Sequence, residues 1–359
     1  MSSVDPSKTP LLPNLSGAKS NFENPPSLLA AQTGTGIALI VVSAVLLAIR
    51  LSTNKKLHRK LCLDDWLCLI AFAGGIGYWA VYNVVSRWGT ARHAWDVPVT
   101  TMTVSMIQMQ VAIRFLVAPA LWAAKAAILA LYIRIFGTIT WLRRTAYFWI
   151  VFMALFYGMN IAIAGVYCIP RNDEAWEGAA FARCSTSAWL NVVVGVFSCL
   201  ADLLILILPF PIVMRLHISL AKKVSLGIVF GTGLLLVVLS IISLYLRVIV
   251  FGGTDPTWNG TILGIITVAE IFGTIAVSCA PSMSSFWLNI LIKSTIWSEL
   301  KSSFVFSWKS QPSKQNLADI QQNDSTYILR ETTYEVLEDG ASRKSSNHQT
   351  HDPVSTKHR

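Results

Sequence analysis

The chain has 359 residues, of which 53% are hydrophobic and only 13% are charged. A soluble domain carries about twice that share of charged residues, and the mean hydropathy of +0.54 also excludes an ordinary soluble domain. The formal net charge of +10 does not indicate a nucleic-acid-binding protein, because the Lys and Arg residues fall in short stretches between apolar runs and form no basic groove with aromatic residues.

Residues 1–27 are rich in Ser and Pro and form the expected N-terminal tail outside the membrane. They lack the basic start and apolar core of a secretory signal peptide. The first apolar run, which follows them, is therefore expected to act as an uncleaved signal anchor.

Apolar runs dominate residues 28–292, and most of them reach the ~20 residues that cross a hydrocarbon core of about 30 Å. They are apolar on almost all sides, whereas an amphipathic soluble helix has a polar face. The sequence therefore predicts an all-α fold, a polytopic bundle of seven transmembrane helices. The spans are expected at residues 28–51, 66–85, 106–136, 146–167, 188–214, 224–251 and 262–292.

The basic residues between the spans predict the orientation of the bundle. Short cytoplasmic loops carry more Lys and Arg than outer loops, and here the first, third and fifth loops are richer than the second, fourth and sixth. This places the N-terminus outside and the C-terminus in the cytoplasm. The glycosylation sequons at Asn14 and Asn259 both fall on the predicted outer side. The basic residues of the odd loops are Arg50, Lys55, Lys56, Arg59, Lys60, Arg134, Arg143, Arg144, Arg215, Lys222 and Lys223.

Cys168 and Cys184 both lie in the fourth loop, on the side that is expected to be oxidising. We expect a disulfide between them that closes a small loop. The alternative is a pair of free thiols.

After the last span, residues 293–310 predict a juxtamembrane amphipathic helix on the inner leaflet. Trp297, Leu300, Phe304 and Trp308 recur at intervals of three or four residues, which would give such a helix one apolar face. The alternative is an irregular linker with aromatic anchors. Residues 311–359 are polar, mixed in charge and rich in Ser, Gln and Asn, which is typical of a disordered cytoplasmic tail.

Ionisable groups near the middle of the bilayer are costly and are candidates for function by default. Lys125, Asp202 and Glu270 are predicted to lie there. Lys125 shares a helical stripe with Gln110, Arg114 and Tyr132, since residues four, seven and eleven apart return to similar angles. Asp202 and Glu270 lie on polar stripes of their own spans. The predicted ligand-binding or intramembrane polar site therefore consists of Gln110, Arg114, Lys125, Asp202 and Glu270.

We expect Lys125 to form an ion pair with Asp202 or with Glu270, and the sequence leaves open which one. The alternative interpretation is a buried ion pair that only fixes the register of the helices. Arg114 and Arg247 lie near the predicted outer boundary, where a long side chain can also reach the headgroups as an anchor.

Several kinds of site are missing from the sequence. None of the six His residues lies in a predicted span, which excludes haem or di-iron sites built from helix histidines. No phosphate-binding or zinc-protease motif is present, and the last span has no central Lys for a retinal Schiff base. We assign no catalytic residue, metal or cofactor. The lack of internal repeats also argues against an inverted-repeat transporter.

Several short motifs along the chain together carry a family resemblance. They are Leu63-Asp-Asp-Trp-Leu67, Lys125 with Leu131-Tyr-Ile-Arg-Ile-Phe136, Cys168-Ile-Pro170 with Trp176 and Cys184, Asp202 through Pro209-Phe-Pro211, and Asp255-Pro-Thr-Trp258 with Glu270 and Ala280-Pro281. With these motifs the chain resembles the fungal rhodopsin-domain family of integral membrane proteins, which includes satratoxin-cluster proteins and is related to Pth-type receptor-like proteins. The resemblance covers about residues 33–291 and implies a seven-helix receptor-like protein without bound retinal.

The leading interpretation is a receptor-like protein in the plasma membrane or another membrane of the secretory pathway. A cavity lined by the third, fifth and seventh spans would hold a small-molecule ligand, and the basic inner loops would contact a cytoplasmic signalling partner. One alternative is a transporter of a metabolite or of protons. Another is a cyclase-like intramembrane enzyme that uses Asp202 or Glu270 as a general acid, although an enzyme is the less favoured class.

Overall fold

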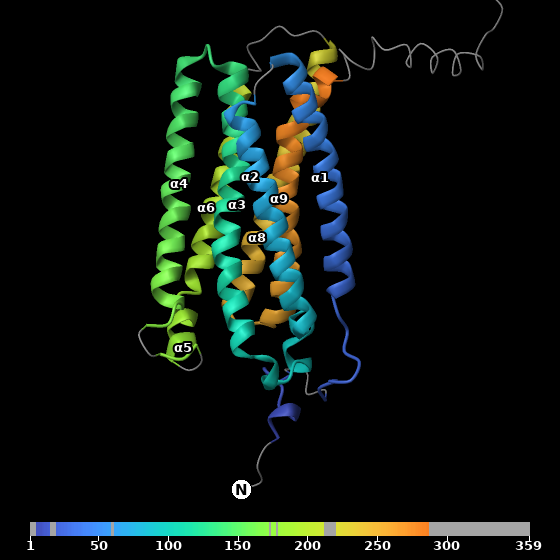
Figure 1. Cartoon of the computed structure of the whole chain (residues 1–359), viewed down its shortest axis with the longest axis vertical. Coiled ribbons are helices and arrows are strands. Elements are labelled where there is room, and N and C mark those ends of the chain that lie inside the picture. The colour runs from blue at the N-terminus through green and yellow to red at the C-terminus, as the bar shows by residue number, and fades with distance from the viewer. Residues whose placement is uncertain are drawn as a thin grey trace, which may run out of the picture. The chain divides into compact units, whose positions relative to one another are not determined.

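The computed structural model describes residues 5–14, 19–58, 61–171, 174–176, 179–211 and 220–286. The chain divides into two units, Met1–Lys293 and Ser294–Arg359, and every described residue belongs to the first. Within these residues all regular elements are helices (Figure 1). The predicted juxtamembrane helix at 293–310 and the tail at 311–359 lie outside the described residues.

Seven helical segments are long and apolar enough to cross a membrane, which confirms the predicted seven-helix architecture. A short additional helix, α5, precedes α6, and four single turns lie in the N-terminal segment and in the connection between α2 and α3. The long helices are α1 (Leu29–His58), α2 (Leu63–Val85), α3 (Val104–Phe136), α4 (Thr140–Cys168), α6 (Trp189–Ile207), α8 (Leu220–Phe251) and α9 (Pro256–Phe286); the short elements are α5 (Ala179–Thr186), η1 (Pro6–Lys8), η2 (Ser86–Thr90), η3 (Ala94–Asp96) and η4 (Val99–Thr101).

The helix boundaries differ from the predicted spans where polar residues extend a helix beyond its apolar part. α1 continues to His58 and α4 starts at Thr140, because helix geometry tolerates charged residues that a hydropathy pattern excludes. α9 starts at Pro256, a residue type that suits the first turn of a helix. α6 ends at Ile207, shortly before Pro209, as expected for a residue that cannot continue a helix.

α3 is the most enclosed of the seven spans and α4 is among the least enclosed. α3 packs along α2 and also contacts α4, α6 and α9, while α9 packs against α1, α2 and α8. Figure 1 shows α4 and α1 at opposite edges of the bundle. Large apolar side chains on the outer faces are exposed, among them Leu155 at 68%, as expected for surfaces that face lipid. Side chains that meet between helices therefore come mainly from α3 and α9.

Close contact between α1 and α2 depends on Gly36. A Cβ atom at this position would lie 1.9 Å from Nε1 of Trp79 and 2.4 Å from its Cδ1, so the indole ring occupies the space that any side chain would need. Small residues at helix interfaces of membrane proteins allow this kind of approach. Gly34, two residues earlier on the same helix, faces open space.

One end of the bundle, which we call the disulfide end, carries the bond between Cys168 and Cys184. The predicted disulfide is thus present, and Cys184 lies on α5, a short helix that the sequence did not predict. Arg183 on α5 donates hydrogen bonds to both carboxylate oxygens of Glu174. These bonds and one from the backbone of Arg171 lower the pKa of Glu174, so this pair is charged at neutral pH.

The N-terminal segment also lies at the disulfide end, across the connection between α2 and α3. The amide of Leu11 donates to the carbonyl of Val97 over 2.8 Å, and the amide of Val99 donates to Thr9 over 3.0 Å. In the same connection the ring of His93 is stacked between Trp95 and Trp258, with centroid distances of 4.5 and 3.9 Å. This connection is therefore tied both to the N-terminal segment and to the start of α9.

Candidate functional site

Lys125 lies in the interior of the bundle on α3 and has no exposed surface. Its Nζ atom is 2.6 Å from Oδ1 of Asp202 on α6 and 3.0 Å from Oε1 of Glu270 on α9. Both carboxylates are buried as well. The structure therefore brings together the three charged residues that the sequence singled out, and Lys125 contacts both partners where the sequence left a choice between them.

Two serines complete this group, which we call the central cluster: Lys125, Ser198, Asp202, Ser240 and Glu270. Lys125 Nζ also donates to the carbonyl oxygen of Ser198 over 3.1 Å and to its Oγ over 2.9 Å. The Ser198 hydroxyl donates to Oε1 of Glu270 over 2.7 Å, and the Ser240 hydroxyl donates to Asp202. Helices α3, α6, α8 and α9 each contribute, so the cluster links four helices through charge-assisted hydrogen bonds.

The central cluster holds one ammonium group and two carboxyl groups. With all three ionised its charge is −1, which is costly in an interior of low dielectric constant. Arg247 is the next positive charge along α8, seven residues or about 10 Å from Ser240. A cluster with this composition can respond to a proton or to a change in the position of Arg247, because either one alters its charge balance.

The other residues on the predicted stripe of α3 lie at different places. Tyr132 is buried and its hydroxyl donates to the carbonyl of Ile205 over 3.2 Å. Arg114 is half-buried, and its Nη1 is 3.5 Å from the hydroxyl of Ser187. Gln110 is exposed, and at 1.5 Å per residue it lies roughly 22 Å along the helix from Lys125. Among the predicted residues, the cluster thus unites Lys125 with the two carboxylates, but not with Gln110 or Arg114.

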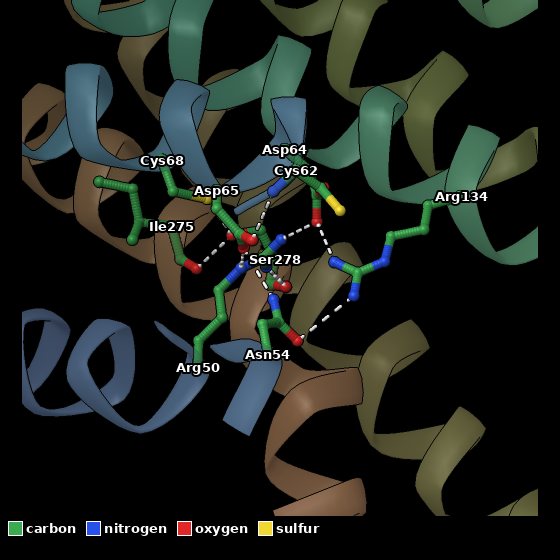
Figure 2. A network of polar contacts seen from close by, with 9 residues as sticks. All are labelled: Arg50, Asn54, Cys62, Asp64, Asp65, Cys68, Arg134, Ile275 and Ser278. Atoms are coloured by element: carbon green, nitrogen blue, oxygen red, sulfur yellow. Dashed lines mark hydrogen bonds and ion pairs between the residues drawn. The ribbon is translucent and has the colours of Figure 1, made fainter. Parts of the chain in front are cut away.

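A second buried group lies where α1 ends and α2 begins, at the end of the bundle opposite α5 (Figure 1). Figure 2 shows its polar contacts. Arg50 on α1 is fully buried. Its Nε donates to Oδ1 of Asp65 over 2.9 Å, and Nη2 is 2.5 Å from Oδ2 of Asp64. Nη1 donates to the carbonyl of Ser278 on α9. One guanidinium group therefore joins α1, α2 and α9, using the planar fork of donors that distinguishes Arg from Lys.

Arg134 and Asn54 extend this group to α3. Arg134 Nη1 donates to Oδ2 of Asp64 over 3.0 Å, and the Asn54 amide donates to Oδ1 of Asp65 over 2.8 Å. We call the whole set, Arg50, Asn54, Asp64, Asp65, Arg134 and Ser278, the Arg50 network. It contains two guanidinium groups and two carboxylates, so its charges are balanced, in contrast to those of the central cluster.

Cys62 lies close enough to Asp64 and Asp65 for the three side chains to share a metal ion. Both carboxylates, however, already accept hydrogen bonds from Arg50, and those of Arg134 and Asn54 fill further positions around them. A cation at this place would have to displace a buried guanidinium group. We therefore interpret the three residues as part of the Arg50 network.

Comparison with known proteins places this arrangement in a family. The model of the fungal rhodopsin domain matches residues 49–288, which is more than half of the chain. The chain belongs to the fungal rhodopsin domain family. The matched residues include both the central cluster and the Arg50 network, so the two charge clusters are features of the fungal rhodopsin domain of this protein.

A SAT4 family membrane protein of Emericella nidulans is 28% identical over 184 residues. The aligned part covers 50% of this chain and 46% of that protein, so the chain matches about half the length of this relative. No solved structure matches the chain. The family and the seven helices together show a multi-pass membrane protein.

The Arg50 network was not predicted as a site. The sequence groups Arg50 with the basic residues of the first loop, and the Asp64-Asp65 pair contributes only to the family resemblance. Two adjacent acidic residues at the start of an apolar span are a usable signal, because buried carboxylates require a positive partner. Arg50 is not recognisable as this partner from the sequence, because a basic residue at the end of a span is expected to face water.

Proposed function

We propose that this fungal rhodopsin-domain protein is a receptor-like membrane protein in which a ligand at the disulfide end changes the helix arrangement at the opposite end. In this proposal the disulfide end is outside the cell and the Arg50 network is at the cytoplasmic face. The central cluster would be the group whose charge balance the ligand alters. The supporting observations are the two buried clusters and the helices that they share.

The observation that carries the proposal is that α3 and α9 each contribute to both clusters. Lys125 and Arg134 are nine residues apart on α3, or about 13 Å along the axis. Glu270 and Ser278 are eight residues apart on α9, or about 12 Å. A displacement of either helix that changes one cluster must also move its partner residue in the other, because packed helices move as rigid elements rather than deform continuously.

The cost of breaking buried ion pairs supports two discrete arrangements rather than a gradual change. Removal of one partner from such a pair costs about 3–5 kcal/mol. A ligand must therefore supply differential binding energy between the two arrangements. The basic residues expected on the cytoplasmic side would then be presented differently to a signalling partner in each arrangement.

A fluorescent probe at the Arg50 end tests this coupling. Ile135 is 47% exposed and follows Arg134 at the end of α3, so Ile135→Cys offers a site for a bimane label. Cys62→Ser and Cys199→Ser remove the more accessible free thiols; Cys68 and Cys279 are buried. In lipid nanodiscs, Asp202→Asn and Glu270→Gln should shift the bimane emission maximum, although Lys125, which contacts both residues, lies ten residues or about 15 Å along α3 from the label.

Two controls define the outcome. Arg134→Gln should shift the emission directly, which proves that the probe reports on this end, and Gly158→Ala on α4, which faces open space, should leave it unchanged. If Arg134→Gln shifts the emission and neither carboxyl variant does, the coupling is absent and the proposal fails.

The same protein in liposomes tests the transport alternative. Proton or solute flux that requires Asp202 and needs no partner protein would replace the receptor interpretation with transport. Flux at the level of protein-free liposomes is expected. This measurement does not depend on the fluorescent label, so the two results can be read separately.

A further inference from the structure

A small cavity lies between α3, α4, α6 and α8, on the disulfide side of the central cluster. Its volume is about 30 Å³, enough for a water molecule or a small polar group. Leu121 and Val194 lie one helical turn before Lys125 and Ser198 on their helices, so the cavity adjoins the central cluster. The lining residues are Arg114, Val117, Ala118, Leu121, Asn160, Ala164, Leu190, Asn191, Val194 and Arg247.

Two guanidinium groups face this cavity, from Arg114 on α3 and Arg247 on α8. A guanidinium group has five N–H donors, but the hydrogen bonds found here are few and long. Arg114 reaches Ser187 over 3.5 Å, and Arg247 reaches Ser243 over 3.3 Å and the carbonyl of Asn191 over 3.4 Å. Among the described residues neither guanidinium forms an ion pair within 4.0 Å. Both therefore keep donor capacity for an added acceptor.

The charges in this part of the bundle do not cancel. Arg114, Lys125 and Arg247 contribute three positive charges, and Asp202 and Glu270 contribute two negative charges, which leaves one positive charge when all are ionised. Arg247 is only 8% exposed, and an uncompensated charge in such a position is costly. One added negative charge would balance the set.

The remaining lining residues limit the kind of anion. Asn160 and Asn191 offer amide groups beside the guanidinium groups, while the other walls are aliphatic. Two arginines match a planar carboxylate through parallel hydrogen bonds. The aliphatic walls favour a ligand whose carboxylate is attached to an apolar group. Because the cavity is small, it holds the carboxylate but not the whole ligand.

We propose that the cavity between Arg114 and Arg247 is a binding site for the carboxylate of an apolar monocarboxylic acid. The acid could enter from water or from the bilayer, and the carboxylate is the chemistry common to both sources. The site deepens the proposed function by naming the class of its ligand, but the binding itself requires no signalling. An acid bound to Arg247 would weaken the attraction of this residue for Glu270 and so connect the cavity to the central cluster.

Binding to the full chain in nanodiscs tests this proposal directly. Thermal unfolding is measured with increasing concentrations of sodium benzoate or sodium laurate. Benzoate enters from water, whereas laurate partitions into the bilayer. Sodium chloride at equal concentration controls for ionic strength, and benzamide and lauramide control for the uncharged shapes. At least one acid should raise the melting temperature in a saturable way, while its amide and chloride should not.

Substitutions at the two arginines locate the site. Arg114→Gln and Arg247→Gln should each weaken acid binding roughly tenfold or more, as expected for the loss of charge-assisted hydrogen bonds. Arg87→Gln, an exposed arginine at the same end that does not line the cavity, is the matched control and should bind normally. If Gln at either site prevents folding, Arg114→Lys keeps the charge and should still weaken binding, because Lys lacks the planar fork.

A third variant leaves both arginines in place. A Cβ atom at Gly195 would lie 2.6 Å from Cδ of Arg247, so Gly195→Ala should push that side chain out of position and weaken acid binding. Binding of neither acid to the wild-type chain would overturn the proposal. So would binding that persists unchanged in Arg114→Gln, Arg247→Gln and Gly195→Ala. Neither result depends on the probe at residue 135, so failure of this site and failure of the receptor function remain distinguishable.

Discussion

Lys125 has no exposed surface, yet its ammonium group contacts two carboxylates and two oxygen atoms of Ser198. Desolvation of an ammonium group is expensive, and only this complete set of acceptors offsets it. The position of the residue in α3 fixes which helices can supply them. Removal of the ammonium should therefore affect α6 and α9 as well as α3.

Lys125→Met leaves two carboxyl groups facing each other without a cation, so we expect a loss of about 3–5 kcal/mol of stability. Unfolding in increasing fractions of SDS measures it. The triple variant Lys125→Met/Asp202→Asn/Glu270→Gln should recover part of the loss, because no charge then remains buried. Lys55→Met, at an exposed position, is the control. Equal stability of Lys125→Met and wild type would show that the cluster is hydrated.

Arg50 makes a different prediction, because its geometry matters as much as its charge. Arg50→Lys keeps the positive charge but cannot reach Asp64, Asp65 and Ser278 together, and each lost hydrogen bond to a charged group costs about 1.5–3 kcal/mol. We expect a clear fall in melting temperature, measured in detergent. Arg144→Lys, at an exposed position, should leave it unchanged. A neutral result for Arg50→Lys would mean that charge alone holds the network.

At the level of single residues the sequence could predict which charges are buried in mid-membrane, since they interrupt long apolar runs. It could not predict that Lys125 contacts both carboxylates, because that depends on how α3, α6 and α9 are rotated against one another. Arg114 and Arg247 were each interpretable as interface anchors. Their shared cavity becomes visible only when α3 and α8 are placed in space.

At the level of helices, the contact between α1 and α2 makes a sharp comparison possible. Gly36→Ala places a Cβ atom 1.9 Å from Nε1 of Trp79, and such overpacking typically costs about 1–3 kcal/mol. Gly34→Ala, in the same helix and facing open space, should be neutral or stabilising by up to about 1 kcal/mol, because Ala favours a helix over Gly. Thermal unfolding of both variants separates packing from helix propensity. Equal effects would exclude tight packing at Gly36.

For the connection between α4 and α6, the prediction concerns the stability that the disulfide contributes. Cys168 and Cys184 are separated by 16 residues, and a loop of this size corresponds to about 3 kcal/mol in the chain-entropy view. Cys168→Ser/Cys184→Ser should lower the unfolding free energy by up to this amount in SDS titrations. The ion pair between Arg183 and Glu174 remains in this variant. Arg183→Gln therefore measures the separate and smaller contribution of this ion pair to stability. A stability equal to that of wild type would mean that packing alone orders the loop.

The number and type of the helices were predictable because uncharged runs of about twenty residues have few other solutions. The ends were less predictable, since α1 and α4 continue into residues that a hydropathy pattern reads as loop. α5 was missed because its eight residues have no long apolar run. The disulfide was predictable from two cysteines in one outer loop.

For the whole molecule, the seven-helix architecture and the membership of the fungal rhodopsin domain family agree with the distribution of charge. The central cluster and the Arg50 network lie at different depths and have different charge balance. The balanced network suits a fixed contact, whereas the unbalanced cluster suits a group that responds to a ligand or a proton. The orientation of the bundle decides which end could bind a ligand and which end could contact a signalling partner.

The orientation of the whole molecule is the last prediction. From the Lys and Arg residues in the odd loops we predict that the disulfide end lies outside. Lys8 and Lys55 are both exposed and lie before and at the far end of α1, so one span separates them. In a background with Cys62→Ser and Cys199→Ser, a membrane-impermeant maleimide should label Lys8→Cys on intact protoplasts. It should label Lys55→Cys only after permeabilisation.

A second measurement reads the same orientation without added thiols. If the N-terminal segment enters the secretory lumen, the sequon at Asn14 can be glycosylated, and Asn14→Gln should abolish any shift caused by endoglycosidase. Asn259 is the less accessible sequon, because it lies in the first turn of α9 and its amide donates to the carbonyl of Thr254 over 2.8 Å. Labelling of Lys55→Cys but not Lys8→Cys on intact protoplasts would reverse the orientation. The disulfide would then face a reducing compartment, and the arginine cavity would open toward the cytoplasm.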